Sequence, residues 1–190
     1  MQRVRKGLSI LHWRLREQGP GVTLLWLKDH LLRVLTGMSP PATSRIRPNL
    51  YVGGQHYRWG MGRMAGLGIS ASLSVRREAD DKDLGVALEK HLWLPTTDDA
   101  PPSLEQLGEA SAFIGEALQE GRGVYVHCMS GVGRAATTAA AYLVTTGLTP
   151  DQAWAAIGEV RPFLRPSDDQ LAVIAELHER HGTRESLDNF

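Results

Sequence analysis

The chain of 190 residues is predicted to fold as an α/β domain in three layers, with a mainly parallel central sheet flanked by helices. Short apolar runs rich in β-branched residues alternate along the chain with longer segments of helical period. Apolar residues make up 42% of the chain and charged residues 22%, which favours a packed core over disorder.

Four strands are expected, because four short runs have a β-rich composition and are bounded by glycine or proline. These runs are residues 49–54, 68–76, 91–95 and 123–128. The last of them, GVYVHC, is short and apolar, as a buried strand would be.

Four helices are expected in the same region, at residues 103–120, 132–146, 150–160 and 167–181. Ser103 can cap the first of these helices, and Pro150 suits the first turn of the third. Ser167 and Gln170 have the spacing of a capping box at the start of the fourth.

Residues 1–41 are predicted to form a helical N-terminal arm, followed by a domain at 42–182 and a tail at 183–190. Two short amphipathic helices, 8–16 and 22–35, are expected in the arm, separated by Gly19-Pro20-Gly21. Residues 1–40 contain seven basic and two acidic residues, a net charge of +5, so the remainder carries −5. This asymmetry suggests that the arm and the domain have different tasks.

Two interpretations of the arm stay open. The arm is either a cap whose apolar side packs on the domain, or a helix pair that lies on an anionic membrane surface. A membrane span is not expected, because the second helix is short and is interrupted by ionisable residues.

Composition narrows the class of protein. Lysine and arginine total 21, as do aspartate and glutamate, which argues against a nucleic-acid binder that works by bulk charge. The single cysteine excludes an intramolecular disulfide framework and suits a reducing compartment, so a cytoplasmic protein, either free or peripheral to a membrane, is expected. The acidic run at 79–83 lacks the glycine and glutamate of a calcium loop and is interpreted as a solvated turn.

The segment with the clearest chemistry follows the strand at 123–128. Cys128 ends this strand, and a loop containing Gly131 and Gly133 leads into the next helix. Such a loop directs backbone N–H groups and the positive end of a helix dipole at one point, which suits a phosphate and also a thiolate. Arg134 lies six residues after Cys128, where its planar guanidinium can bind two phosphate oxygens.

The sequence HCMSGVGR at 127–134 matches the His-Cys-x5-Arg signature of the protein tyrosine phosphatase superfamily. Three further blocks resemble its dual-specificity branch: RIRPNLYVGGQ, LPTTDDAPPSLEQL and EVRPFLRPSDDQLAVIAEL. The resemblance covers roughly residues 45–180, and so includes the domain but not the arm. It implies a fold of the dual-specificity phosphatase type.

The resemblance implies that Cys128 attacks phosphorus and that Arg134 binds the phosphoryl oxygens. It also implies that His127 orients the loop, and that no metal or organic cofactor takes part. The substrate phosphate would lie in a cradle made of Met129, Ser130, Gly131, Val132, Gly133 and Arg134.

The family has an aspartate a few residues after a proline as general acid. Asp98 matches this spacing after Pro95, with Asp99 as the second choice. A polar side chain of the last loop often positions the water for the second step, and Ser167 and Gln170 are the nearest candidates here, although both also fit the capping box. One departure is Ala135, which stands where the family usually has Ser or Thr. Breakdown of the phospho-cysteine is therefore expected to be slow.

The function implied is a dual-specificity protein phosphatase that acts through a phospho-cysteine on a phosphorylated protein or a small phosphate monoester. Two alternatives stay open: a lipid phosphate monoester phosphatase of the phosphatidylglycerophosphate type, and a non-catalytic phosphate-binding module. The uncharged positions 129–133 argue against a highly anionic head group.

Overall fold

The computed structural model describes the backbone of residues 2–188 and the side chains of residues 9–181. Five strands form one sheet in the order β1-β2-β5-β3-β4. β1 is antiparallel to β2, whereas the other neighbouring strands are parallel. The predicted mainly parallel sheet is therefore confirmed, with an antiparallel edge that the sequence did not indicate. The strands are β1 (Arg45–Arg47), β2 (Leu50–Gly54), β3 (Ile69–Arg76), β4 (Lys90–Thr96) and β5 (Gly123–Cys128).

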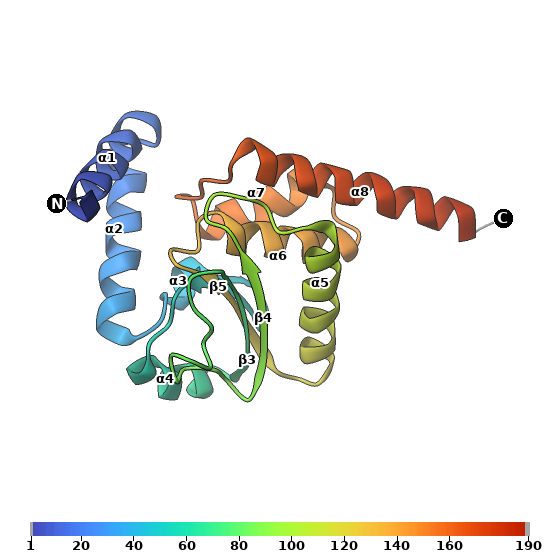
Figure 1. Cartoon of the computed structure of the whole chain (residues 1–190), viewed down its shortest axis with the longest axis horizontal. Coiled ribbons are helices and arrows are strands. Elements are labelled where there is room, and N and C mark those ends of the chain that lie inside the picture. Colours follow the sequence, from blue (N-terminus) through green and yellow to red (C-terminus); the bar gives the residue numbers. More distant parts are fainter. Residues whose placement is uncertain (1, 189–190) are drawn as a thin grey trace.

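Helices cover both faces of this sheet (Figure 1). One group, α5 to α8, packs on one face, while α4 and the end of the arm cover the other. All the predicted helices are present, with ends shifted by up to seven residues, whereas α3, η1 and α4 were not predicted. The helices are α1 (Gln2–Glu17), α2 (Gly19–Thr36), α3 (Pro41–Ser44), η1 (Arg58–Gly60), α4 (Met61–Gly66), α5 (Leu104–Gln119), α6 (Arg134–Thr145), α7 (Pro150–Val160) and α8 (Asp168–Asp188).

The alternation of side chains along β5 divides the interior into two apolar layers. Val124 and Val126 face the larger core, which contains the small residues of α6. Tyr125 points to the opposite face, where it packs with Met38 and Met64. The alanines of α6 allow this helix to approach the sheet closely, and that approach holds the end of β5 against the start of the helix.

Helix α2 contacts the domain through polar side chains. α2 buries Thr23, Asp29 and Arg33, whereas leucines along the same helix are exposed. Asp29 accepts a hydrogen bond from Thr43 at 2.7 Å, and Arg33 Nη1 donates to the carbonyl oxygen of Gln55 at 2.8 Å. The interpretation of the arm as a cap whose apolar side faces the domain is therefore wrong for α2, because the side of α2 that faces the domain carries ionic groups that find partners there.

Two glycines set the path of the arm. α2 begins at Gly19, within the predicted break, and Pro20 occupies its first turn. Gly37 ends α2 with a φ of +83°, and its N–H bonds the carbonyl oxygen of Arg33. A Cβ on Gly37 would lie 2.2 Å from the backbone nitrogen of Gly60, so only glycine fits there. None of the helices among the described residues combines the length and apolar character needed to cross a membrane.

Candidate active site

Cys128 lies at the carboxyl end of β5, directly before the loop that leads into α6. Its side chain is buried, and Sγ accepts a hydrogen bond from the backbone N–H of Gly131 at 3.2 Å. Gly131 has a φ of +68°, and a Cβ there would lie 2.3 Å from the carbonyl carbon of Gly53. Glycine is therefore required for the loop to curl around the sulfur.

The first turn of α6 is open toward the same place. Gly133 precedes the helix and supplies no side-chain cap, so the backbone N–H groups of the first turn are left for another partner. Cys128 and Arg134 line one cavity of about 580 Å³ together with Met129, Ser130, Val132 and Gly133. A phosphate in this cavity would meet the positive end of the helix dipole.

Arg134 is almost completely buried and its position is fixed from several sides. Nη1 donates to the carbonyl oxygen of Thr96 at 2.8 Å and lies 3.1 Å from Glu78 Oε1, while Nη2 lies 2.9 Å from Asp98 Oδ1. Among the described atoms Nε has no hydrogen-bond partner. Although burial opposes the charge, the neighbouring Cys128, Glu78 and Asp98 raise the pKa of Arg134 above its usual value. A permanently charged clamp with a free N–H group therefore borders the cavity.

Asp98 is brought to the cavity by the loop that follows β4. Its side chain is 57% exposed and pairs with Arg134. Asp99, the second choice for the general acid, has a φ of +62°, and its carbonyl oxygen accepts a hydrogen bond from Ser167 at 3.0 Å. Both aspartates line the cavity, but only Asp98 contacts the arginine.

Gln170 connects the loop that carries Asp98 and Asp99 with the loop before α8. Its Oε1 accepts from the Ser167 backbone N–H at 3.1 Å, and the N–H of Gln170 bonds the Ser167 hydroxyl, which are the two contacts of the predicted capping box. Its Nε2 donates to the carbonyl oxygen of Ala100 at 3.0 Å. A Cβ on Gly133 would lie 2.9 Å from Oε1, so the amide is next to the cradle. Its role in positioning water stays a prediction.

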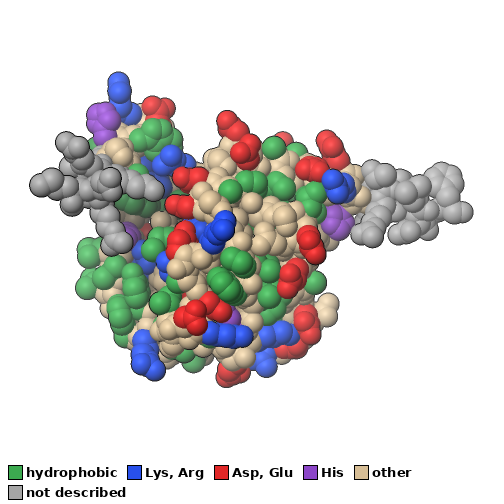
Figure 2. Space-filling model, viewed as in Figure 1, with side chains coloured by type: hydrophobic (Ala, Val, Ile, Leu, Met, Phe, Trp, Pro, Cys, Tyr) green, Lys and Arg blue, Asp and Glu red, His purple; other side chains and the backbone are tan. Residues whose placement is uncertain are grey.

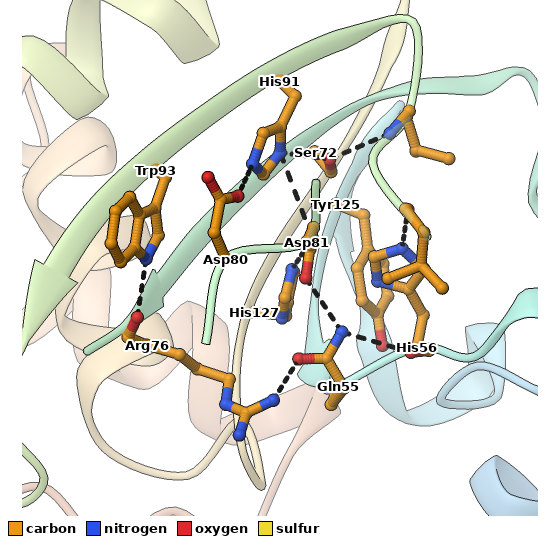
Figure 3. Close-up of polar contacts among 12 residues, drawn as sticks. Gln55, His56, Ser72, Arg76, Asp80, Asp81, His91, Trp93, Tyr125 and His127 are labelled. Carbon is orange, nitrogen blue, oxygen red and sulfur yellow. Dashed lines mark hydrogen bonds and ion pairs between the residues drawn. The ribbon is translucent and has the colours of Figure 1, made fainter. Parts of the chain in front are cut away.

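Asp81 holds the side chain of His127, the residue that precedes Cys128 (Figure 3). His127 Nε2 donates to Asp81 Oδ2 at 2.7 Å, and both side chains have no exposed surface. The interpretation of residues 79–83 as a solvated turn was therefore wrong for Asp81. The carboxylate is buried because it accepts hydrogen bonds from His127 and from Gln55 Nε2 at 2.9 Å.

Further polar groups join the same network. Gln55 Oε1 accepts from Arg76 Nη1, and His56 Nε2 donates to the carbonyl oxygen of Val86 at 2.7 Å (Figure 3). Burial opposes the charge of Asp81, but the hydrogen bond and charge of His127 hold its pKa far below the usual value. Burial, with the nearby His127, lowers the pKa of His56 to about 4, so the His56 imidazole is neutral near pH 7.

His56, Asp81 and His127 are also the one group of metal-ligand atoms at suitable spacing that the described residues contain, with their atoms within 4.8 Å of one another. The Nε2 atoms of both histidines and the carboxylate of Asp81 already take part in hydrogen bonds to one another or to the backbone. These hydrogen bonds account for the three buried side chains, which support the end of β5 that carries Cys128.

Ala135 is completely buried in the main core, so no hydroxyl is present at the position where the family usually has one. The hydroxyls of Thr137 and Thr138 donate to the carbonyl oxygens of Gly133 and Arg134, at 3.2 and 2.9 Å. Both are therefore engaged by the helix backbone rather than by Cys128.

One side of the cavity was not predicted. Five residues of the arm line it, together with Arg165 of the loop before α8: Ser9, Ile10, Trp13, Arg14 and Trp26. Glu78, which pairs with Arg134, was also missed. No local pattern marks these residues, because their approach depends on how the arm and the domain pack.

Comparisons with known proteins identify the family of the domain. Residues 50–180 match the family model described as the catalytic domain of dual specificity phosphatases. The chain belongs to this family. The mouse protein called dual specificity protein phosphatase 12 is 35% identical over 120 residues, which are 62% of this chain and 35% of that protein. The human phosphatidylglycerophosphatase and protein-tyrosine phosphatase 1 is 35% identical over 109 residues, which are 56% of this chain and 53% of that protein. The chain thus spans about a third to a half of the length of these relatives.

Solved structures give the same assignment. The crystal structure of PTPMT1 in complex with PI(5)P is 25% identical, with a TM-score of 0.68, and the match covers 74% of this chain and 96% of that one. The crystal structure of human DUSP28 has a TM-score of 0.66 at 22% identity and covers 74% and 99%, which supports the fold. The predicted membership of the dual-specificity branch and the predicted fold are confirmed.

Proposed function

We propose that the chain is a phosphate monoester hydrolase that works through a phospho-cysteine on Cys128. The observation that carries the proposal is the contact of Sγ with a backbone N–H inside a glycine loop at an uncapped helix end. Arg134 and Asp98 border the same cavity. Nucleophile, anion cradle, cation and acid therefore share one space.

In the first step the Cys128 thiolate attacks phosphorus, the P–S bond forms and the bond to the leaving oxygen breaks. Arg134 binds the phosphoryl oxygens through its free Nε and through Nη2, which Asp98 releases. Protonated Asp98 then donates its proton to the leaving oxygen, because an alkoxide or phenoxide leaves poorly at neutral pH.

In the second step water attacks the phospho-cysteine and gives a proton to the Asp98 carboxylate. The P–S bond breaks, and phosphate and the thiolate are released. Gln170, whose amide lies beside Gly133, is placed to orient this water. Since Ala135 offers no hydroxyl to the departing sulfur, the second step is expected to limit turnover.

The test is phosphate release from an aryl phosphate by the wild type and by Cys128→Ser. The variant should lose at least about 99% of turnover but still bind inorganic phosphate, because the cradle consists of backbone groups and Arg134. Turnover by Cys128→Ser near the wild-type rate would exclude the phospho-cysteine route. A wild type that binds phosphate but releases none from any monoester would instead indicate a non-catalytic phosphate-binding module.

For the substrate we propose a phosphoprotein, in line with the dual-specificity relatives. A lipid phosphate monoester is a second candidate, favoured by the outer surface of α2. Four leucines there, which we call the apolar stripe of α2, have 41–66% of their surface exposed: Leu24, Leu27, Leu31 and Leu35. Trp59, 60% exposed, lies beside them and donates to the carbonyl oxygen of Val34. Figure 2 shows hydrophobic side chains gathered on this side of the molecule.

For this second candidate we propose that the apolar stripe of α2 lies on an anionic membrane surface, on the cytoplasmic side. Exposed Lys28 and Arg58, from the same two elements as the leucines and Trp59, would attract anionic lipid, and the leucines would enter the interface. The similarity to a phosphatidylglycerophosphatase supports a lipid substrate.

Sedimentation with vesicles tests the membrane proposal. The double variant Leu27→Glu, Leu31→Glu should bind phosphatidylglycerol vesicles at least about tenfold more weakly, since burial of each leucine contributes ~1.5–3 kcal/mol. Leu171→Glu, at an exposed leucine on α8, is the matched control and should bind as the wild type does. Equal binding by both variants, or no binding by the wild type, would contradict the membrane proposal and leave the phosphoprotein substrate.

A further inference from the structure

The arm contributes a buried cation to the catalytic cavity. Arg14 of α1 is only 2% exposed and lines the cavity that contains Cys128. Its Nη1 donates to the carbonyl oxygen of Phe163 at 3.0 Å, and its guanidinium lies 4.7 Å from the centre of the Trp26 ring. Its Nε has no hydrogen-bond partner among the described atoms. A buried N–H of a charged group without a partner is costly, and a ligand oxygen would remove that cost.

A second cation lies on the same side of the cavity. Arg165, in the loop before α8, is exposed, and its guanidinium lies 4.6 Å from the centre of the Trp13 ring. Among the described side chains neither Arg14 nor Arg165 forms an ion pair. Burial, together with the charge of Arg165, lowers the pKa of Arg14 to about 10, as expected for two uncompensated cations near each other.

Among the described side chains, neither Asp98 nor Asp99, the two acidic residues that line the cavity, forms an ion pair with Arg14 or Arg165. Asp98 is held by Arg134, at the catalytic end. The backbone position of α1 is tied to the loop that carries Arg165, because Gln18 Nε2 donates to the carbonyl oxygen of Leu164 at 2.8 Å. Each of the two guanidinium groups is held against a tryptophan ring. Both groups are therefore already ordered before an anion binds.

We propose that Arg14 and Arg165 form a second anion subsite beside the catalytic cradle, and that among small phosphate monoesters the site prefers a compact molecule carrying a second phosphate group. This inference rests on the proposed function, because the first phosphate is the one that Cys128 attacks. Arginine favours phosphate, whose oxygens accept from its planar fork.

The size of the cavity limits the distance between the two phosphates. Both arginines share about 580 Å³ with Cys128, a volume that suits a small molecule or a lipid head group. Ile10 and the two indole rings provide apolar contact for a short carbon chain between the phosphates. The uncharged loop 129–133 had argued against a highly anionic head group, but the extra cations come from the arm and from residue 165.

Calorimetry on Cys128→Ser tests the subsite without turnover. The probes are alkanediol bisphosphates of increasing length and the alkyl monophosphates that match them. At the best length the bisphosphate should bind at least about tenfold more tightly than its monophosphate, beyond the twofold advantage of having two ends. Adding Arg14→Met or Arg165→Gln should reduce this preference to about twofold to threefold.

Arg16→Gln is the matched control, because Arg16 is an exposed arginine of the same helix that does not line the cavity. It should keep the full preference. Affinity for the monophosphate reports whether each variant retains an intact cradle. If Arg14→Met no longer binds the monophosphate, the test rests on Arg165→Gln, because the Arg165 side chain is exposed. The same preference in all variants, or no preference in the Cys128→Ser parent, would overturn the subsite.

The source of the ligand and the proposed function are tested separately. A diacyl lipid with the best bisphosphate head group, supplied in vesicles, distinguishes a lipid substrate from a soluble one. If only a doubly phosphorylated peptide shows a preference that depends on Arg14, the proposal of a compact substrate is wrong. If the wild type releases no phosphate from any monoester, the hydrolase proposal fails while the binding data still decide the subsite.

Discussion

Replacing Asp98 by asparagine should have opposite effects on turnover and on phosphate binding. Turnover of alkyl phosphates should fall by about 10²–10⁴-fold, the usual contribution of a general acid. The loss should be smaller for an aryl phosphate with an acidic leaving group, which needs the proton less. Steady-state kinetics with both substrates measure this difference.

Phosphate binding should become tighter in the same variant. Asp98 Oδ1 lies 2.9 Å from Arg134 Nη2, so the carboxylate occupies a group that the phosphate needs. Because the Asp98 side chain is 57% exposed, the pair is worth about 0.2–1 kcal/mol. Its removal should lower the inhibition constant of inorganic phosphate by roughly 1.4–5-fold.

Asp99→Asn is the matched control, since Asp99 is on the same loop and has a left-handed backbone that asparagine tolerates. This control should change neither quantity by more than about twofold. A larger loss of turnover in Asp99→Asn would transfer the acid role to Asp99. Equal losses for aryl and alkyl substrates, or weaker phosphate binding in Asp98→Asn, would refute the reasoning.

Three further predictions concern stability and the second step. His56 has a pKa of about 4 in the fold and ~6.5 when unfolded, so stability should fall by about 3 kcal/mol as the pH drops through this interval. In urea titrations at several pH values, the free energy of unfolding of His56→Gln should fall less steeply as the pH drops. An unchanged pH dependence would contradict the assignment of this effect to His56. Gly131→Ala should cost at least ~2 kcal/mol and most activity, because its Cβ would meet the Gly53 backbone; normal melting and turnover would exclude a tight cradle. Ala135→Ser should speed decay of the phospho-cysteine in rapid-quench measurements, and no change would mean that another donor serves the sulfur.

The sequence alone determined the parallel strands of the sheet, the main helices and the loop from Cys128 to Arg134. These features depend on local patterns: β-rich runs, helical period, capping residues and glycines close together in the chain. The capping box of Ser167 and Gln170 was predictable for the same reason. The family signature added the expected roles of Cys128 and Arg134, because its positions are contiguous.

Only the tertiary structure decided what surrounds that loop. Asp81 looked like part of a solvated acidic turn, yet it is buried because β5 places His127 against it. The sequence left open whether the leucines of α2 pack on the domain, yet Asp29 and Arg33 face the domain, where Thr43 and Gln55 satisfy them. Arg14 enters the cavity through contacts with Phe163, 149 residues away. Such pairings depend on which groups can satisfy one another across the fold, and no periodicity within a segment records them.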